Sequence, residues 1–141
     1  MKNYLTILAA VFVTVALTTK DANAGMETLL ASAARTATTS TADQQKVVNR
    51  GVYVFLKVTA VPTVETLTVT IQGKDVDGTY YTILASTASA ATGTVTLKVY
   101  PGLPNTANVS SNEVLPDLWR VTVTHSASGS FTYSIVANTL P

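Results

Sequence analysis

From Gly51 to the C-terminus, apolar and polar residues alternate with a period of two in a series of short segments. Side chains at alternate positions of a β-strand share one face, so each segment has an apolar face and a polar face. Such alternation predicts half-buried strands, and residues after Met26 show no competing helical repeat of normal length. The predicted inward faces of the first two segments hold Val52, Val54, Leu56, Val58, Leu67, Val69 and Ile71.

Turn-forming residues separate the alternating segments. Asp77-Gly78 predicts a hairpin turn, and Pro101-Gly102 opens one long connection that runs to Asp117. Short strands with one long crossover and no helix are typical of two packed antiparallel sheets. We therefore predict an all-β fold: a single antiparallel β-sandwich, immunoglobulin-like or jelly-roll-like, that changes sheets in the long connection. The predicted strands, about seven, lie near residues 29–38, 52–60, 66–72, 79–87, 94–100, 119–125 and 131–135.

The first 25 residues have a different character. Lys2 is followed by an uncharged stretch from Tyr4 to Leu17, and Ala22-Asn23-Ala24 has the small-residue pattern that precedes a signal-peptidase cleavage site. This order predicts an export signal that is cleaved near Ala24. The alternative is a retained apolar arm that contacts a membrane through residues 4–19 or packs on a neighbouring subunit.

The sequence thus divides into three parts. Residues 1–25 form the signal-like leader, residues 26–50 an N-terminal strand and arm with a loop near 43–50, and residues 51–141 the sandwich domain. Membrane contact is expected only through the leader, and the location is extracellular or in a virion.

Charge and cysteine content exclude several functions. Only 12% of residues are charged, and the nine basic residues are spread from Lys2 to Arg120. Nucleic-acid binding needs several basic side chains on one face, so it is not expected. The chain has no cysteine, which excludes disulfides, thiolate nucleophiles and cysteine-ligated metal sites. No cofactor is predicted.

Candidate chemistry is sparse. His125 is the single histidine, on the strand face of Val121 and Val123, and no nucleophile motif accompanies it. We therefore predict no enzymatic activity and no catalytic residue. Asp75 and Asp77 resemble part of a calcium loop, but the pattern lacks its further ligands, so we interpret them as turn residues and predict no metal site.

Tyr80 and Tyr81 are the candidate contact residues. Because they are adjacent in a predicted strand, their side chains must point to opposite faces of the sheet. One of them is expected outside, where its ring can stack on a sugar or a partner, and Asp75 and Asp77 lie in the same hairpin. The alternative is a partly covered surface tyrosine with no ligand.

Five segments follow one another as a run of strands and turns: LLASAARTAT (29–38), RGVYVFLKVTAV (50–61), TIQGKDVDGTYYTILAS (70–86), LKVYPGL (97–103) and LPDLWRVTVTHSASGSFTYSI (115–135). Together they resemble small virion-associated proteins of tailed phages and prophages. The resemblance spans roughly residues 27–137 and implies a β-sandwich of the decoration or accessory type, without assigned functional residues; the leader departs from that family. Separately, residues 71–81 are similar to a hairpin of discoidin-like and other carbohydrate-binding sandwiches.

Two functions follow as expectations. The first is a non-enzymatic structural subunit, either a phage virion accessory or decoration protein or a self-assembling extracellular subunit. Its partners would be copies of itself and other virion or surface-layer subunits, with residues 26–50 as a strand exchanged between neighbours. The alternative is a secreted carbohydrate- or surface-binding module that uses Tyr80 or Tyr81.

Overall fold

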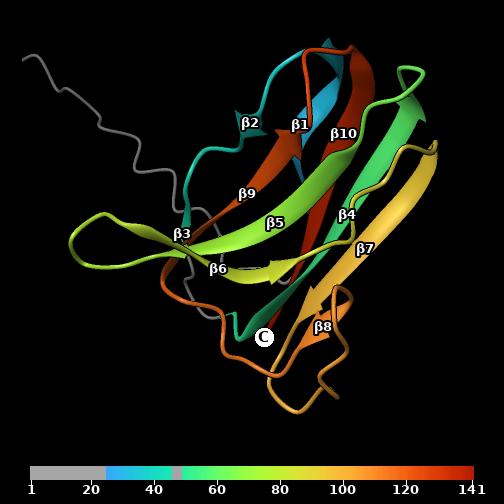
Figure 1. Ribbon diagram of the computed structural model, residues 1–141. Helices are drawn as coiled ribbons and strands as arrows, with labels where there is room; N and C mark the ends of the chain where they lie inside the picture. Colours follow the sequence, from blue (N-terminus) through green and yellow to red (C-terminus); the bar gives the residue numbers. More distant parts are fainter. Residues whose placement is uncertain (1–24, 46–48) are drawn as a thin grey trace, which may run out of the picture.

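A computed structural model describes residues 25–45 and 49–141, and it shows two β-sheets packed face to face (Figure 1). Seven strands have six or more residues, which confirms the predicted all-β sandwich of about seven strands. The strands are β1 (Met26–Arg35), β2 (Thr39–Ser40), β3 (Gln44–Gln45), β4 (Gly51–Ala60), β5 (Leu67–Lys74), β6 (Tyr80–Ala85), β7 (Gly93–Val99), β8 (Ser110–Ser111), β9 (Leu118–His125) and β10 (Phe131–Leu140).

The two sheets differ in strand order. Sheet A has the order β1-β10-β4-β7-β8, and sheet B has the order β2-β9-β5-β6, with β3 also paired to β9. All pairings among the described strands are antiparallel except the short β7–β8 pair, which is parallel. The chain leaves sheet A after β8 and enters sheet B at β9, so the long connection changes sheets as predicted. It is not the only crossover among the described strands, because the β4–β5, β6–β7 and β9–β10 connections also pass from one sheet to the other.

The core lies between the sheets and is made of the inward faces of the alternating strands. All seven predicted inward residues of β4 and β5 are buried, and so are Val121, Val123 and Trp119 on β9. Burial of this much apolar surface is the main favourable term in folding. The largest fully buried side chains are Trp119, Tyr133 and Phe131, so the sandwich is filled by aromatic rings as well as by branched aliphatic residues.

Residues 26–45, the N-terminal strap, cover one lateral side of the sandwich. β1 pairs with β10 and completes sheet A, whereas β2 and β3 pair with β9 and complete sheet B. Hydroxyl groups tie the strap where ladder pairing is short: Thr41 Oγ1 accepts from the Val121 amide at 3.1 Å, and Thr38 Oγ1 accepts from the His125 amide at 3.4 Å. The predicted arm is therefore part of both sheets of its own chain.

Bulges and an arginine shape the edge of β1. The register shifts by one residue between Thr28 and Leu30 and again between Leu30 and Ala33. The Arg35 guanidinium donates to the carbonyls of Ala31 at 2.8 Å, Ala33 at 3.1 Å and Tyr133 at 2.7 Å. Bulges and occupied carbonyls blunt a sheet edge against pairing with another chain.

The opposite lateral side is left more open. Among the described residues, β6 is the last strand of sheet B, and β8 covers only Lys98 and Val99 of β7. The carbonyl of Ala85 accepts a hydrogen bond from the Asn108 side chain at 2.9 Å, at the end of β6. No proline or charged residue lies within β6.

Some predictions about the N-terminal part fall outside the described residues. The leader prediction concerns residues 1–24 and remains a prediction. The loop expected near 43–50 holds the two-residue strand β3, and its residues 46–48 are also outside the description. In the part of the chain that is described, no helix has the length and apolar character needed to cross a membrane.

Candidate functional site

The β5–β6 hairpin projects from the end of the sandwich (Figure 1). Its turn is closed by a hydrogen bond from the Gly78 amide to the Asp75 carbonyl at 3.1 Å, and Gly78 has a φ of 86°. A positive φ at this position of a hairpin turn favours glycine, because it has no Cβ. The predicted Asp77-Gly78 turn is therefore confirmed.

Asp75 shapes this turn from within. Its Oδ1 atom accepts hydrogen bonds from the amides of Asp77 at 3.0 Å and Thr79 at 2.8 Å, which is a typical Asx-turn arrangement. Asp77 is exposed beside it. Within residues 25–45 and 49–141, no three His, Asp or Glu side chains lie close enough to share a metal ion. The geometry of Asp75 is thus accounted for by backbone hydrogen bonds.

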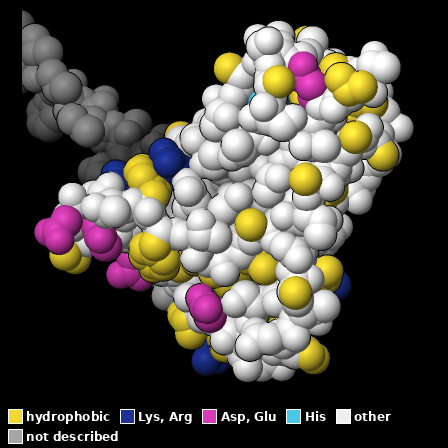
Figure 2. Space-filling view, in the orientation of Figure 1, with side chains coloured by type: hydrophobic (Ala, Val, Ile, Leu, Met, Phe, Trp, Pro, Cys, Tyr) yellow, Lys and Arg dark blue, Asp and Glu magenta, His cyan; other side chains and the backbone are white. Residues whose placement is uncertain are grey.

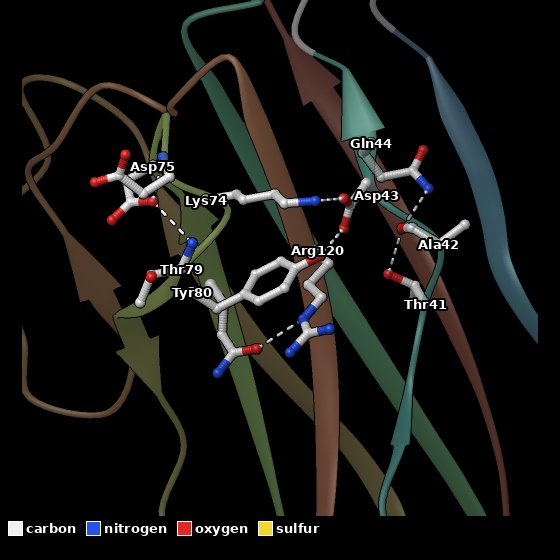
Figure 3. Close-up of polar contacts among 11 residues, drawn as sticks. Thr41, Ala42, Asp43, Gln44, Lys74, Asp75, Thr79, Tyr80 and Arg120 are labelled. Carbon is white, nitrogen blue, oxygen red and sulfur yellow. Dashed lines mark hydrogen bonds and ion pairs between the residues drawn. The ribbon is translucent and has the colours of Figure 1, made fainter.

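Tyr80 lies on the outer face of sheet B within a polar network (Figure 3). Its hydroxyl donates to Asp43 Oδ1 at 2.6 Å, and the Arg120 guanidinium carbon lies 3.4 Å from the ring centroid. Lys74 Nζ bonds Asp43 Oδ2 at 2.8 Å and lies 5.2 Å from the same centroid. Arg120 Nε donates to Gln72 Oε1 at 2.9 Å. Both the ring and the hydroxyl of Tyr80 are therefore engaged within the molecule.

The electrostatics of this network join the hairpin to the N-terminal strap. The hydrogen bond from Lys74, and then that from Tyr80, lowers the pKa of Asp43 below its ordinary value of 3.8. The same bond to Asp43 raises the pKa of Lys74 above 10.5. The ion pair is partly exposed, so water screens it and its net contribution to stability is small. Its role is positional, because it holds residue 43 against the hairpin.

Tyr81 occupies the other face of the same strand. Its side chain is 46% exposed and borders an open groove of about 380 Å³. The groove is also bordered by the fully exposed Val76 and by Leu118, and its polar groups come from Lys74, Asp75 and Asp117. Figure 2 shows hydrophobic and acidic side chains side by side on the projecting hairpin.

One side of the Tyr81 ring is supported by residues of the hairpin and the crossover. Gly73 is the cross-strand partner of Tyr81, and a Cβ on Gly73 would lie 2.5 Å from Tyr81 Cζ and 2.8 Å from Pro116 Cγ. The ring therefore packs against the bare backbone of Gly73, where any larger residue would displace it. This packing holds one side of the ring in a fixed orientation.

His125 is buried at the end of β9 and has no catalytic partner in the described structure. Nε2 lies 3.3 Å from the Tyr133 hydroxyl, and Nδ1 is buried without a hydrogen-bond partner. The ring meets Phe131 edge-on, with the ring centroids 5.0 Å apart. Burial lowers the pKa of His125 below its ordinary value of 6.5, which favours the neutral imidazole, and the ring packs among core side chains.

The structure separates the four predicted contact residues. The two tyrosines do point to opposite faces, but Tyr80 on the outer face is held by its own chain, whereas Tyr81 borders the groove. Sequence reasoning missed Asp43, Arg120 and Leu118. Alternation alone places Arg120 on the outer face of its strand, but only the pairing of β9 with β5 brings it to Tyr80.

Comparison with known proteins gives no family assignment. The chain matches none of the protein-family models, and no curated protein sequence matches it.

Proposed function

We propose that this chain is a non-enzymatic structural subunit. It belongs to an assembly of the kind that the phage-like segments suggest, as a virion accessory or decoration protein, or it forms an extracellular layer or filament with copies of itself. The observation that carries the proposal is the contrast between a closed lateral side and the open edge of β6. An unpaired, uncharged strand edge is a surface on which another chain can add a strand.

The composition of the open edge supports the same proposal. The six residues of β6 lack charge and proline, which are the usual devices that keep strand edges apart. The side chains of Tyr81 and Thr82 are exposed there, and both are β-favouring residues. The N-terminal strap is already used within the chain, so the subunit contact is better placed on the β6 side than on residues 26–50.

The test compares two identical substitutions on one sheet. Thr82→Lys puts a charge on the open edge, whereas Thr124→Lys puts the same charge at an exposed position of β9, which has strands on both sides. We expect the wild-type protein from its natural source in a particle or oligomer, Thr124→Lys to assemble normally, and Thr82→Lys to remain a monomer. Native mass measurement with light scattering gives the answer.

Two outcomes would contradict the proposal. A wild-type protein that is monomeric at every concentration, and absent from particles or filaments of its source, removes the structural function. Normal assembly of Thr82→Lys, at unchanged thermal stability, removes the β6 edge as the contact and leaves the structural function to be sought on another surface.

A second candidate function is a carbohydrate- or surface-binding module. The specific observation that favours it is Tyr81, an aromatic ring that is half-exposed, held in place on one side and bordered by carboxylates. Aromatic rings with a few fixed polar groups are the common lining of small-ligand sites.

A further inference from the structure

The groove beside Tyr81 has the parts of a sugar subsite. A pyranose ring presents an apolar C–H face, which packs on an aromatic ring, and a rim of hydroxyls, which bond to carboxylates and ammonium groups. Tyr81 supplies the ring, and Asp75, Asp117 and Lys74 supply polar groups along the groove.

The charged side chains at the groove favour neutral sugars over acidic ones. Lys74 is paired with Asp43 at 2.8 Å, so its charge is largely balanced before a ligand binds. The carboxylate of Asp75 lies on the groove, and Asp77 lies two residues further along on the exposed turn. The Arg120 guanidinium is held against Tyr80, on the outer face of the sheet. Uronic and sialic acids would meet this acidic rim with like charge, which disfavours them.

Hydrogen-bonding capacity is available on this rim. Asp75 uses Oδ1 for the two turn amides, and a carboxylate has a second oxygen that accepts further hydrogen bonds. Because the turn holds Asp75 and the Gly73 packing holds Tyr81, both groups are oriented in the free protein. From this arrangement we infer that the Tyr81 groove binds a pyranose unit of a neutral carbohydrate, which stacks on the exposed face of Tyr81.

This inference rests on the second candidate function and assigns its site and ligand class. In the test, the full chain is titrated with cellohexaose and chitohexaose as neutral probes and with a polygalacturonate oligomer as the acidic probe. Calorimetry measures the binding of each probe. We expect the wild type to bind a neutral probe and to bind the acidic probe more weakly.

Four variants locate the site. Tyr81→Ala should weaken binding about tenfold or more, a change that corresponds to about 1.4 kcal/mol. Gly73→Ala should have a similar effect, because its Cβ displaces the ring without removing a groove side chain. Tyr81→Phe keeps the ring and should bind nearly as well as the wild type. Tyr53→Ala, which removes a half-buried tyrosine on sheet A, is the control and should leave binding unchanged.

The outcomes distinguish a wrong site or ligand class from a wrong function, namely carbohydrate binding. Neutral binding that survives Tyr81→Ala in a folded protein overturns the site and leaves a carbohydrate-binding function elsewhere. Tighter binding of the acidic probe overturns the ligand class. Failure of both neutral probes to bind overturns the inference. The half-exposed Tyr81 then no longer supports the second candidate function. If Gly73→Ala fails to fold, Tyr81→Ala and Tyr81→Phe decide the question.

Discussion

On one lateral side of the sandwich, β1, β2 and β3 cover the last long strand of each sheet, whereas on the other side β6 and most of β7 end their sheets. On the closed side, hydroxyl groups and the Arg35 guanidinium form hydrogen bonds with backbone groups. Two bulges also interrupt the edge of β1. On the open side, within the described residues, the Asn108 side chain bonds to the Ala85 carbonyl of β6, and the β8 segment occupies backbone groups at one end of β7. The difference indicates that the closed side maintains the fold and that the open side is available for contacts.

The largest expected effect comes from removing the closed side. Deletion of residues 26–40 should unfold the sandwich, since it exposes the edge of β10 and removes Leu29 and Leu30, which are partly buried and pack against the core. The loss should reach a large part of the ~5–15 kcal/mol that stabilises a domain of this size. Circular dichroism during heating measures it, with Thr82→Lys on the open edge as a variant of near-normal stability. If the variant that lacks residues 26–40 still unfolds cooperatively near the wild-type temperature, the strap is an accessory arm.

A smaller effect is expected from a single side chain on each side. Arg35→Ala frees three carbonyls and removes a cation that lies 4.6 Å from the Tyr133 ring centroid, so stability should fall by about 1–3 kcal/mol. Asn108→Gly, on the open side, keeps the positive φ and loses one hydrogen bond, and should cost less. Urea denaturation of both variants makes the comparison, and an equal or larger loss for Asn108→Gly would contradict it.

The smallest effect concerns pH at the end of the closed side. Burial lowers the pKa of His125 below 6.5, so the unfolded chain binds a proton at a higher pH than the folded one. Stability should therefore be complete above about pH 6.5 and should decrease as the pH falls toward the folded pKa. Arg35, Glu65 and Tyr133 are the ionisable groups near the ring.

The measurement is the urea midpoint as a function of pH. Wild-type protein should lose stability in mild acid, and His125→Gln should lack that part of the decrease, because glutamine takes up no proton. Thr124→Lys, on the neighbouring exposed position, serves as the control and should keep the wild-type slope. An identical pH dependence in His125→Gln would mean that other groups are responsible.

The adjacent tyrosines show where sequence reasoning reached its limit. Alternation required that Tyr80 and Tyr81 face opposite ways, and the structure agrees. Alternation could not tell which of the two side chains is held by contacts within the chain. The partners of Tyr80 come from β9 and from the N-terminal strap, dozens of residues away. Asp43 carries no local pattern that marks it as a partner, and Leu118 reaches the groove only through the order of strands in sheet B.

What the sequence determined by itself was the local part of the fold. The period of two specified which residues of β4, β5 and β9 face inward, and Asp77-Gly78 specified a turn, because side-chain direction and backbone φ depend on near neighbours. Only the tertiary structure decided which strands lie side by side, that β10 lies between β1 and β4, and that the strap closes both sheets. Those pairings join residues far apart in the chain, and alternation is equally compatible with many strand orders.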